Sequence, residues 1–271
     1  MDFSPSLRSG EESIITACFY IYIYFIKFCY FYRAKLSIHF VRFLVGFQKM
    51  AEKNILILCA LKSELKHVLN NLSVKKKEEN FYFANFEGIN IIAAKSGLGK
   101  IRSAAFTQYC IDKTENLQLI VNFGSCGAID ENIDLGDMIF CNKTVEYDFL
   151  SLRNFFPCFH IQNDFPDEFL QDFKFKKGTL LTATRNVDSK EKKIFLKEKF
   201  GGTVADWEGA AIAQIAILNK KRTMIFKCVT DRGDENILTD FNNVFDKVMN
   251  DSSKKMLRFL SFLNRMGYLF P

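Results

Sequence analysis

From Asn54 onward, short apolar runs alternate with segments whose apolar residues recur at helical spacing. The first run, NILILC at 54–59, is almost entirely apolar, as expected for a strand that is buried on both faces. Residues 62–71 then carry apolar side chains on one face of a helix. Such alternation is typical of the α/β class, in which helices cover a sheet of mainly parallel strands.

The rest of the chain continues this alternation without an internal repeat or a linker after Met50. Glu87-Gly88 predicts a hairpin turn, so the sheet should be mixed. We expect residues 50–271 to form a single α/β domain with a mixed, mainly parallel central sheet flanked by helices. The further expected strands are 81–86, 89–94, 119–123, 137–142, 178–184 and 223–230, and the further helices are 97–110, 208–218 and 240–263.

Residues 1–49 form an extension of different, aromatic-rich composition. Residues 14–32 are nearly all apolar or aromatic and are long enough to cross a bilayer, with basic residues following on what would be the cytoplasmic side. A cleaved signal peptide fits less well, because no small-residue cleavage site is evident. We favour translation from Met50, which places the protein in the cytoplasm. A membrane anchor through 14–32 is the alternative.

Charge and cysteine usage exclude several classes of partner. The net charge is +6, but the lysines are interspersed with acids and form no basic stripe with aromatic residues, so we expect no nucleic-acid partner. The eight cysteines include no C-x-x-C pair, as expected for free thiols in a reducing compartment. The three histidines are far apart in sequence, so we expect neither a metal nor any other cofactor.

Polar residues follow several of the expected strands, where ligands gather in open α/β sheets. Glu64 follows the first strand, residues 124–127 (GSCG) follow the central one, and Asp231 ends the last. Singly, these are compatible with a helix-surface acid, a tight turn and a structural cap. With Val187 and Glu208 at further strand ends, they predict one pocket that holds acids and a polar clamp the size of a ribose.

Five segments, in this order, carry a family resemblance that spans 54–264. CALKSEL resembles the start of the methylthioadenosine/S-adenosylhomocysteine nucleosidases. The other four resemble the signature segments of the purine nucleoside phosphorylase/nucleosidase superfamily. The resemblance implies the nucleoside phosphorylase fold and a small-molecule nucleoside as partner. The segments are CALKSEL (59–65), AKSGLGK (94–100), VNFGSCGAI (121–129), DWEGAAIA (206–213) and VTDRGD (229–234).

The resemblance implies roles for three acids. Glu64 matches the general base that activates a water, and Asp231 matches the general acid that protonates the departing purine at N7. Glu208 matches the carboxylate that holds the ribose hydroxyls, with Trp207 where the family usually has Met. These roles suit the reaction, because cleavage of an N-glycosidic bond builds positive charge on the sugar and negative charge on the purine.

The resemblance also implies further substrate contacts. Gly127 and Val187 match backbone contacts around the purine and the sugar, and Ser125 lies in the same segment as Gly127. Phe241 matches an aromatic wall near the 5′ substituent. Where the family commonly stacks an aromatic ring on adenine, this chain reads Thr184-Arg185-Asn186, so Asn186 or Arg185 takes that place or the stack is lost, which puts the exact substrate in question.

Hydrolysis is favoured over phosphorolysis. A phosphorylase binds a dianion, usually through arginine forks, yet no Arg lies between Met50 and Ile101, and Lys227 replaces an Arg that the family often has. Glu64 would also repel phosphate. The expected reaction is hydrolysis of methylthioadenosine and S-adenosylhomocysteine to adenine and the thio-ribose. The alternatives are a nucleosidase for another purine nucleoside such as futalosine, a phosphorylase, and a non-catalytic surface or adhesion protein.

The resemblance implies a homodimer, in which a loop from the partner subunit helps to close the 5′ end of the pocket. The apolar stretch at 155–158 (FFPC) is a candidate for that loop, because such a cluster would be unusual on the surface of a monomer. A loop that faces its own core is the alternative.

Overall fold

The computed structural model describes residues 53–149, 156–234 and 237–270. The expectations for the N-terminal extension, including its possible membrane anchor, and for Phe155 lie outside these ranges. Within the ranges, no helix is long and apolar enough to cross a bilayer. The compact unit Glu52–Pro271 contains all the elements described below.

The elements alternate in the order that the sequence predicts, around one mixed sheet. The strands are β1 (Asn54–Cys59), β2 (Ser73–Glu78), β3 (Phe81–Phe86), β4 (Ile89–Lys95), β5 (Leu117–Ala128), β6 (Met138–Glu146), β7 (Cys158–His160), β8 (Lys176–Thr182), β9 (Val204–Asp206) and β10 (Arg222–Asp231). The helices are α3 (Lys62–Leu69), α4 (Lys100–Lys113), α5 (Glu168–Asp172), α6 (Lys190–Phe200), α7 (Gly209–Leu218) and α8 (Ile237–Arg265).

The sheet is mixed: the strands around β1 and β5 include parallel pairs, whereas the β2–β4 edge and the pairs β10–β6, β5–β9 and β6–β7 are antiparallel. β1 lies parallel between β4 and β5, and β5 pairs in parallel with β10. The strand order is β10-β6-β8-β9-β5-β1-β4-β3-β2, and the extra pairing of β10 with β5 closes the first five strands into a ring. The predicted α/β class with a mixed sheet is confirmed.

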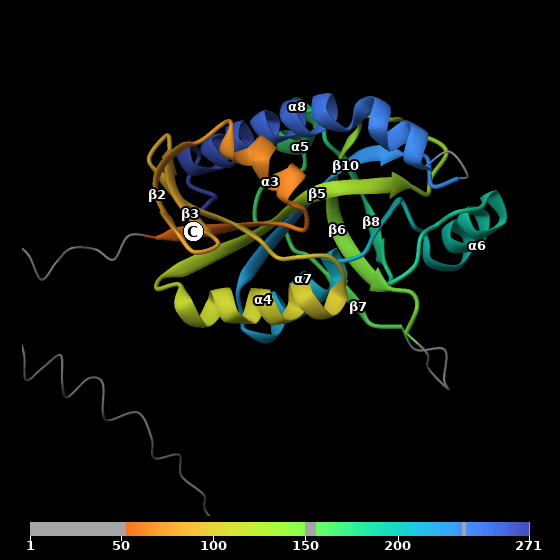
Figure 1. Ribbon diagram of the computed structural model, residues 1–271, viewed down its shortest axis with the longest axis horizontal. Helices are drawn as coiled ribbons and strands as arrows, with labels where there is room; N and C mark the ends of the chain where they lie inside the picture. The colour runs from red at the N-terminus through yellow and green to blue at the C-terminus, as the bar shows by residue number, and fades with distance from the viewer. Residues whose placement is uncertain (1–52, 150–155, 235–236, 271) are drawn as a thin grey trace, which may run out of the picture. The chain divides into compact units, whose positions relative to one another are not determined.

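Helices cover both faces of the sheet. α3, α5 and α8 lie on one face and α4 and α7 on the other (Figure 1). β1 shows why both faces are needed. Ile55 and Ile57 belong to the core cluster that also contains Phe259 of α8, whereas Leu56 and Leu58 belong to the cluster that contains residues of α4 and α7. A continuous apolar run is thus buried on alternate sides, as the sequence predicts.

Several elements differ from the sequence-based expectation, β2 and β5 among them. No strand was predicted between residues 71 and 81, but residues 73–78 form the edge strand β2, which is exposed at all six positions. Charged side chains on an exposed edge strand discourage pairing with other chains. The central strand was expected at 119–123, yet β5 continues to Ala128, so its GSCG segment is strand rather than turn.

Candidate functional site

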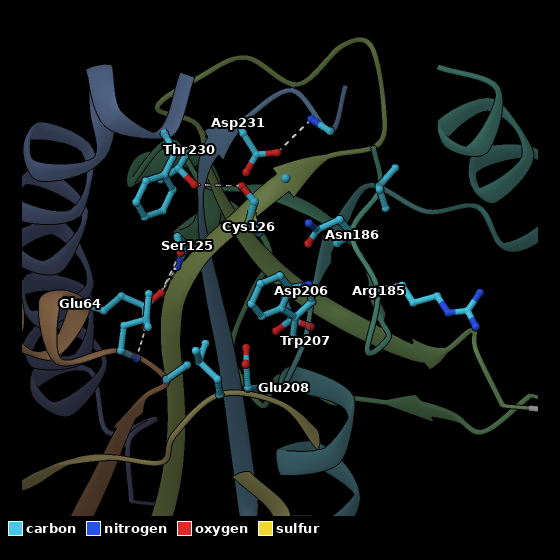
Figure 2. Close-up of a pocket in the computed structure, with 18 of the residues that line it drawn as sticks. Glu64, Ser125, Cys126, Arg185, Asn186, Asp206, Trp207, Glu208, Thr230 and Asp231 are labelled. Carbon is cyan, nitrogen blue, oxygen red and sulfur yellow. Dashed lines mark hydrogen bonds between the residues drawn. The ribbon is translucent and has the colours of Figure 1, made fainter. Parts of the chain in front are cut away.

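All eight sequence-predicted site residues line one cavity of about 300 Å³. It lies at the carboxyl ends of β1, β5 and β10, where the topology of an α/β sheet places ligands. Figure 2 shows the labelled acids on different sides of this cavity. The predicted residues that line it are Glu64, Ser125, Gly127, Val187, Trp207, Glu208, Asp231 and Phe241.

Glu64 lines one side of the cavity and is held by three hydrogen bonds. It lies in the first turn of α3, with 2% of its surface exposed. Its Oε1 accepts hydrogen bonds from the backbone N–H and the hydroxyl of Ser125, both at 2.8 Å, and its Oε2 accepts one from the N–H of Leu61 at 2.9 Å. A Cβ at Gly124 would lie 2.9 Å from Oε1, so any larger residue there would push the carboxylate out of this position.

Asp231 ends β10 and is close to the backbone of β5. Its Oδ1 accepts a hydrogen bond from the N–H of Gly233 at 2.9 Å. A Cβ at Gly127 would lie 2.6 Å from Oδ1, which explains why this strand position is a glycine. Burial raises the pKa of Asp231, and the Gly233 N–H only partly opposes this shift. The environment therefore favours the protonated carboxyl, the form that can donate a proton.

Glu208 is the N-cap residue of α7 and is 5% exposed. Its Oε1 accepts a hydrogen bond from the N–H of Gly99 at 2.8 Å. Burial raises the pKa of Glu208 to about 7 and nearby Asp206 adds to the shift, while Lys227 and the Gly99 N–H act in the opposite direction. The side chain can therefore change its protonation state near neutral pH.

A buried ion pair that sequence reasoning missed lies beneath the cavity. Lys227 Nζ is 2.8 Å from Asp206 Oδ2, and both side chains are 2% exposed. Asp206 also accepts hydrogen bonds from the Thr182 hydroxyl at 2.6 Å and from the Gly209 N–H at 2.8 Å. The signal was a lysine within the apolar run of β10, because a buried ammonium group needs a carboxylate partner.

The remaining wall carries the departures from the family pattern. Trp207, the one tryptophan of the chain, lines the cavity with 39% of its surface exposed. Arg185 and Asn186 are exposed and also line it, but the Arg185 side chain extends away from the labelled acids (Figure 2). Phe241 packs on Phe245, with ring centroids 4.4 Å apart. Within the described ranges, no cluster of His, Cys, Asp or Glu could hold a metal ion.

Several known proteins with similar sequences or folds bear the names of nucleosidases. A 5′-methylthioadenosine/S-adenosylhomocysteine nucleosidase of Buchnera aphidicola is 27% identical over 247 residues, covering 82% of this chain and 97% of the relative. An aminodeoxyfutalosine nucleosidase of Campylobacter jejuni is 25% identical, covering 69% of this chain and 90% of the relative.

Among solved structures, a 5′-methylthioadenosine/S-adenosylhomocysteine nucleosidase from Helicobacter pylori, crystallised with butyl-thio-DADMe-Immucillin-A, shares the fold. Its TM-score is 0.71 at 19% identity, covering 79% of this chain and all of that one. The sequence profile of the phosphorylase superfamily matches residues 54–261, most of the chain and every strand of the sheet. The chain therefore belongs to the phosphorylase superfamily, as its five motif segments implied.

Proposed function

We propose that the protein hydrolyses the N-glycosidic bond of 5′-methylthioadenosine and S-adenosylhomocysteine, releasing adenine and the thio-ribose. The observation that carries this proposal is the convergence of Glu64, Glu208 and Asp231 on one cavity from three separate parts of the chain. The 27% identity to a nucleosidase of that specificity over nearly its whole length supports the same reaction. Such a reaction belongs to nucleoside catabolism and returns methylthio-ribose to methionine salvage.

The mechanism assigns one task to each acid. Asp231, whose pKa burial raises, donates a proton to the purine as the bond breaks. Glu208 accepts hydrogen bonds from the ribose hydroxyls and holds the sugar as it gains positive charge. Glu64 takes a proton from the attacking water. Hydrogen bonds from Ser125 and Leu61 fix the orientation of the Glu64 carboxylate, and this orientation determines where the attacking water can bind.

Water is the better nucleophile for this cavity than phosphate. Four acids line it (Glu64, Asp206, Glu208 and Asp231), and the Arg185 side chain points elsewhere. Lys227 lies beneath and is already paired with Asp206. A dianion would therefore meet net negative charge without the arginine forks that phosphate sites use.

An aminodeoxyfutalosine-type nucleoside is the second candidate substrate. The exposed Trp207 and Asn186 on the cavity wall would suit a larger or more polar nucleoside, and the Campylobacter relative bears that name. The proposed substrate contacts also include four residues that line the cavity: Ser125, Gly127, Val187 and Phe241.

One assay tests the reaction and the substrate together. The purified protein is incubated with methylthioadenosine, S-adenosylhomocysteine and aminodeoxyfutalosine, with and without phosphate, and the products are separated by chromatography. We expect free adenine and a free thio-sugar in phosphate-free buffer. A sugar 1-phosphate formed only with phosphate would establish a phosphorylase instead, and cleavage of aminodeoxyfutalosine alone would establish the second candidate.

We also propose that the protein works as a homodimer in the cytoplasm. Phe156, in the stretch suggested for the partner loop, packs on Phe200 of its own α6 with ring centroids 4.9 Å apart, and the neighbouring Phe195 is 52% exposed. Phe156 packs against its own core, as the alternative of a core-facing loop has it, so the support for a subunit contact comes from the exposed Phe195 beside it. The described cysteines are all free, which suits a reducing compartment. Light scattering at micromolar concentration tests the dimer, and a monomer would contradict it.

A further inference from the structure

A charged cluster beside the cavity is absent from the mechanism above. Lys100, the first residue of α4, donates hydrogen bonds to Glu146 Oε1 at 2.6 Å and to Asp148 Oδ1 at 2.5 Å. The three side chains are only 17%, 19% and 21% exposed. Ion pairs this sheltered from water are screened less than surface pairs, so the cluster can hold backbone segments in place.

The cluster connects two walls of the cavity. On one side, Asp148 Oδ2 accepts a hydrogen bond at 2.8 Å from the N–H of Thr184, which directly precedes the cavity-lining Arg185 and Asn186. The hydroxyl of Tyr147 donates to the carbonyl oxygen of Arg185 at 3.3 Å, from the same loop. The loop after β6 is therefore hydrogen-bonded to the 184–186 segment at two points.

On the other side, Lys100 directly follows Gly99, whose N–H binds Glu208. Leu98, one residue earlier, lines the cavity. Lys100 thus connects the 98–99 segment, which it follows in the chain, with the 184–186 segment, which Asp148 contacts. Its ammonium group also neutralises the repulsion between the carboxylates of Glu146 and Asp148. Without it, two partly buried carboxylates would repel each other across that gap.

The electrostatics agree with a permanent ion cluster. Burial lowers the pKa of Lys100, but its hydrogen bonds to Asp148 and Glu146 outweigh this and leave the pKa above its ordinary value. Burial raises the pKa of Asp148, but Lys100 and the Thr184 N–H outweigh it and leave that pKa below its ordinary value. Both groups therefore stay charged across the neutral range.

We propose that Lys100 is a positioning residue for nucleoside binding: through Asp148 and Glu146 it fixes the 184–186 segment as a wall of the cavity. The inference rests on the proposed function and deepens it. Because Lys100 is hydrogen-bonded through Asp148 to the 184–186 wall and to none of the three acids, its loss should act on substrate affinity more than on bond cleavage. Interactions made equally in the ground state and the transition state change KM and leave kcat alone.

The test is steady-state kinetics of Lys100→Met with methylthioadenosine. Loss of hydrogen bonds to charged groups should raise KM on the order of tenfold and leave kcat within about twofold of the wild type. Lys100→Arg keeps the charge and both contacts, and should restore most of the affinity. Lys113→Met, at the exposed end of the same helix, is the matched control and should leave KM unchanged.

Asp148→Asn is a second variant that leaves Lys100 in place and weakens its link to Thr184. It should raise KM less than Lys100→Met does, and the double variant should be no worse than Lys100→Met alone, because the two act through one path. If Lys100→Met does not fold, the KM of Asp148→Asn tests the inference: a raised KM supports it and an unchanged KM contradicts it.

Three results would overturn the inference. An unchanged KM in the folded variants, with only a lower melting temperature, would make the cluster merely structural. A fall in kcat larger than the rise in KM would place its effect on the chemistry. A wild-type protein that cleaves no nucleoside would refute the proposed function and this inference together, whereas an active wild type with an unchanged KM in the variants refutes the inference alone.

Discussion

At the scale of single residues, the three acids of the cavity differ in what surrounds them. Glu64 accepts three hydrogen bonds from protein groups, whereas Asp231 and Glu208 each accept one, from a backbone N–H. Burial raises the pKa values of the last two. A raised pKa favours the protonated form, which can act as an acid, and a carboxylate with three hydrogen bonds is oriented to accept a proton.

Asp231→Asn should abolish turnover while leaving the affinity for an uncleaved substrate analogue largely intact. The amide keeps the size of the side chain, but it cannot deliver a proton to the departing purine. General acid catalysis contributes on the order of a hundred- to ten-thousand-fold, so kcat should fall by at least that factor. The measurement is kcat beside calorimetric binding of the analogue. Retention of more than about a tenth of the activity would mean that another group is the acid.

Glu208 should make the stability of the protein depend on pH. Its pKa is near 4.5 in the unfolded chain and rises to about 7 in the fold, so the folded state binds the extra proton between these values. Stability is therefore lost as the pH rises from about 4.5 to about 7, where the ionised carboxylate is disfavoured by burial.

Glu208→Gln, which is neutral at every pH, should flatten that part of the profile. The melting temperature of the variant should approach that of the wild type near the acid end and exceed it above neutrality. Thermal unfolding over this pH range measures the effect. Glu198→Gln, on the exposed face of α6, serves as the control and should follow the wild-type profile. Parallel profiles for Glu208→Gln and the wild type would contradict the assignment.

At the scale of elements, local patterns predicted the strands that carry their own signal. The run at 54–59 became β1, and the run before Asp231 became β10. β2 escaped prediction because an exposed edge strand needs no apolar side chains, and β9 because three residues carry too little periodicity.

The site likewise contains residues that carry a local sequence signal and residues that do not. Its acids lie in motif segments at strand ends, so they could be found from the sequence. The pairing of Lys227 with Asp206 depends on how β10, β9 and α7 meet in space, and no spacing in the sequence reveals it. The cluster around Lys100 likewise unites the ends of β6 and β8 with the start of α4, which only the sheet order brings together.

The Lys227–Asp206 pair joins β10 to the end of β9 and should contribute to the stability of the fold. Lys227→Met leaves the carboxylate of Asp206 buried without its cation, a change that costs about 3–5 kcal/mol of unfolding free energy in comparable pairs. Chemical denaturation measures it. The double variant with Asp206→Asn should lose less, because the uncompensated charge is gone.

The control for this prediction is Lys177→Met, which breaks an exposed pair with Asp167. Exposed pairs contribute about 0–1 kcal/mol, so this variant should stay near the wild type. Equal losses for Lys177→Met and Lys227→Met would show that the buried pair has no special role. A double variant less stable than Lys227→Met alone would point to the hydrogen bonds of Asp206 rather than to its charge.

At the scale of the molecule, the closed ring of β5, β6, β8, β9 and β10 explains why distant segments share one cavity. β5 pairs with β1, β9 and β10, so its GSCG segment lies among the ends of three other strands. α3 and α7 begin at this same end and bring Glu64 and Glu208 with them. The site is thus a property of the whole sheet, and every residue assigned to it lies between Ala60 and Phe241.

Protein made from residues 50–271 should therefore fold and cleave nucleosides with the kcat/KM of the 271-residue chain. The compact unit from Glu52 onward has its own apolar core on both faces of the sheet, and a unit of this kind can fold by itself. The superfamily profile also begins only at residue 54. The measurements are yield in the soluble fraction, melting temperature and kcat/KM of both forms, with Asp231→Asn in each as the inactive control. Activity confined to the longer form, or recovered only with membranes, would instead assign residues 1–49 a part in the working enzyme, as an anchor or as a partner of the fold.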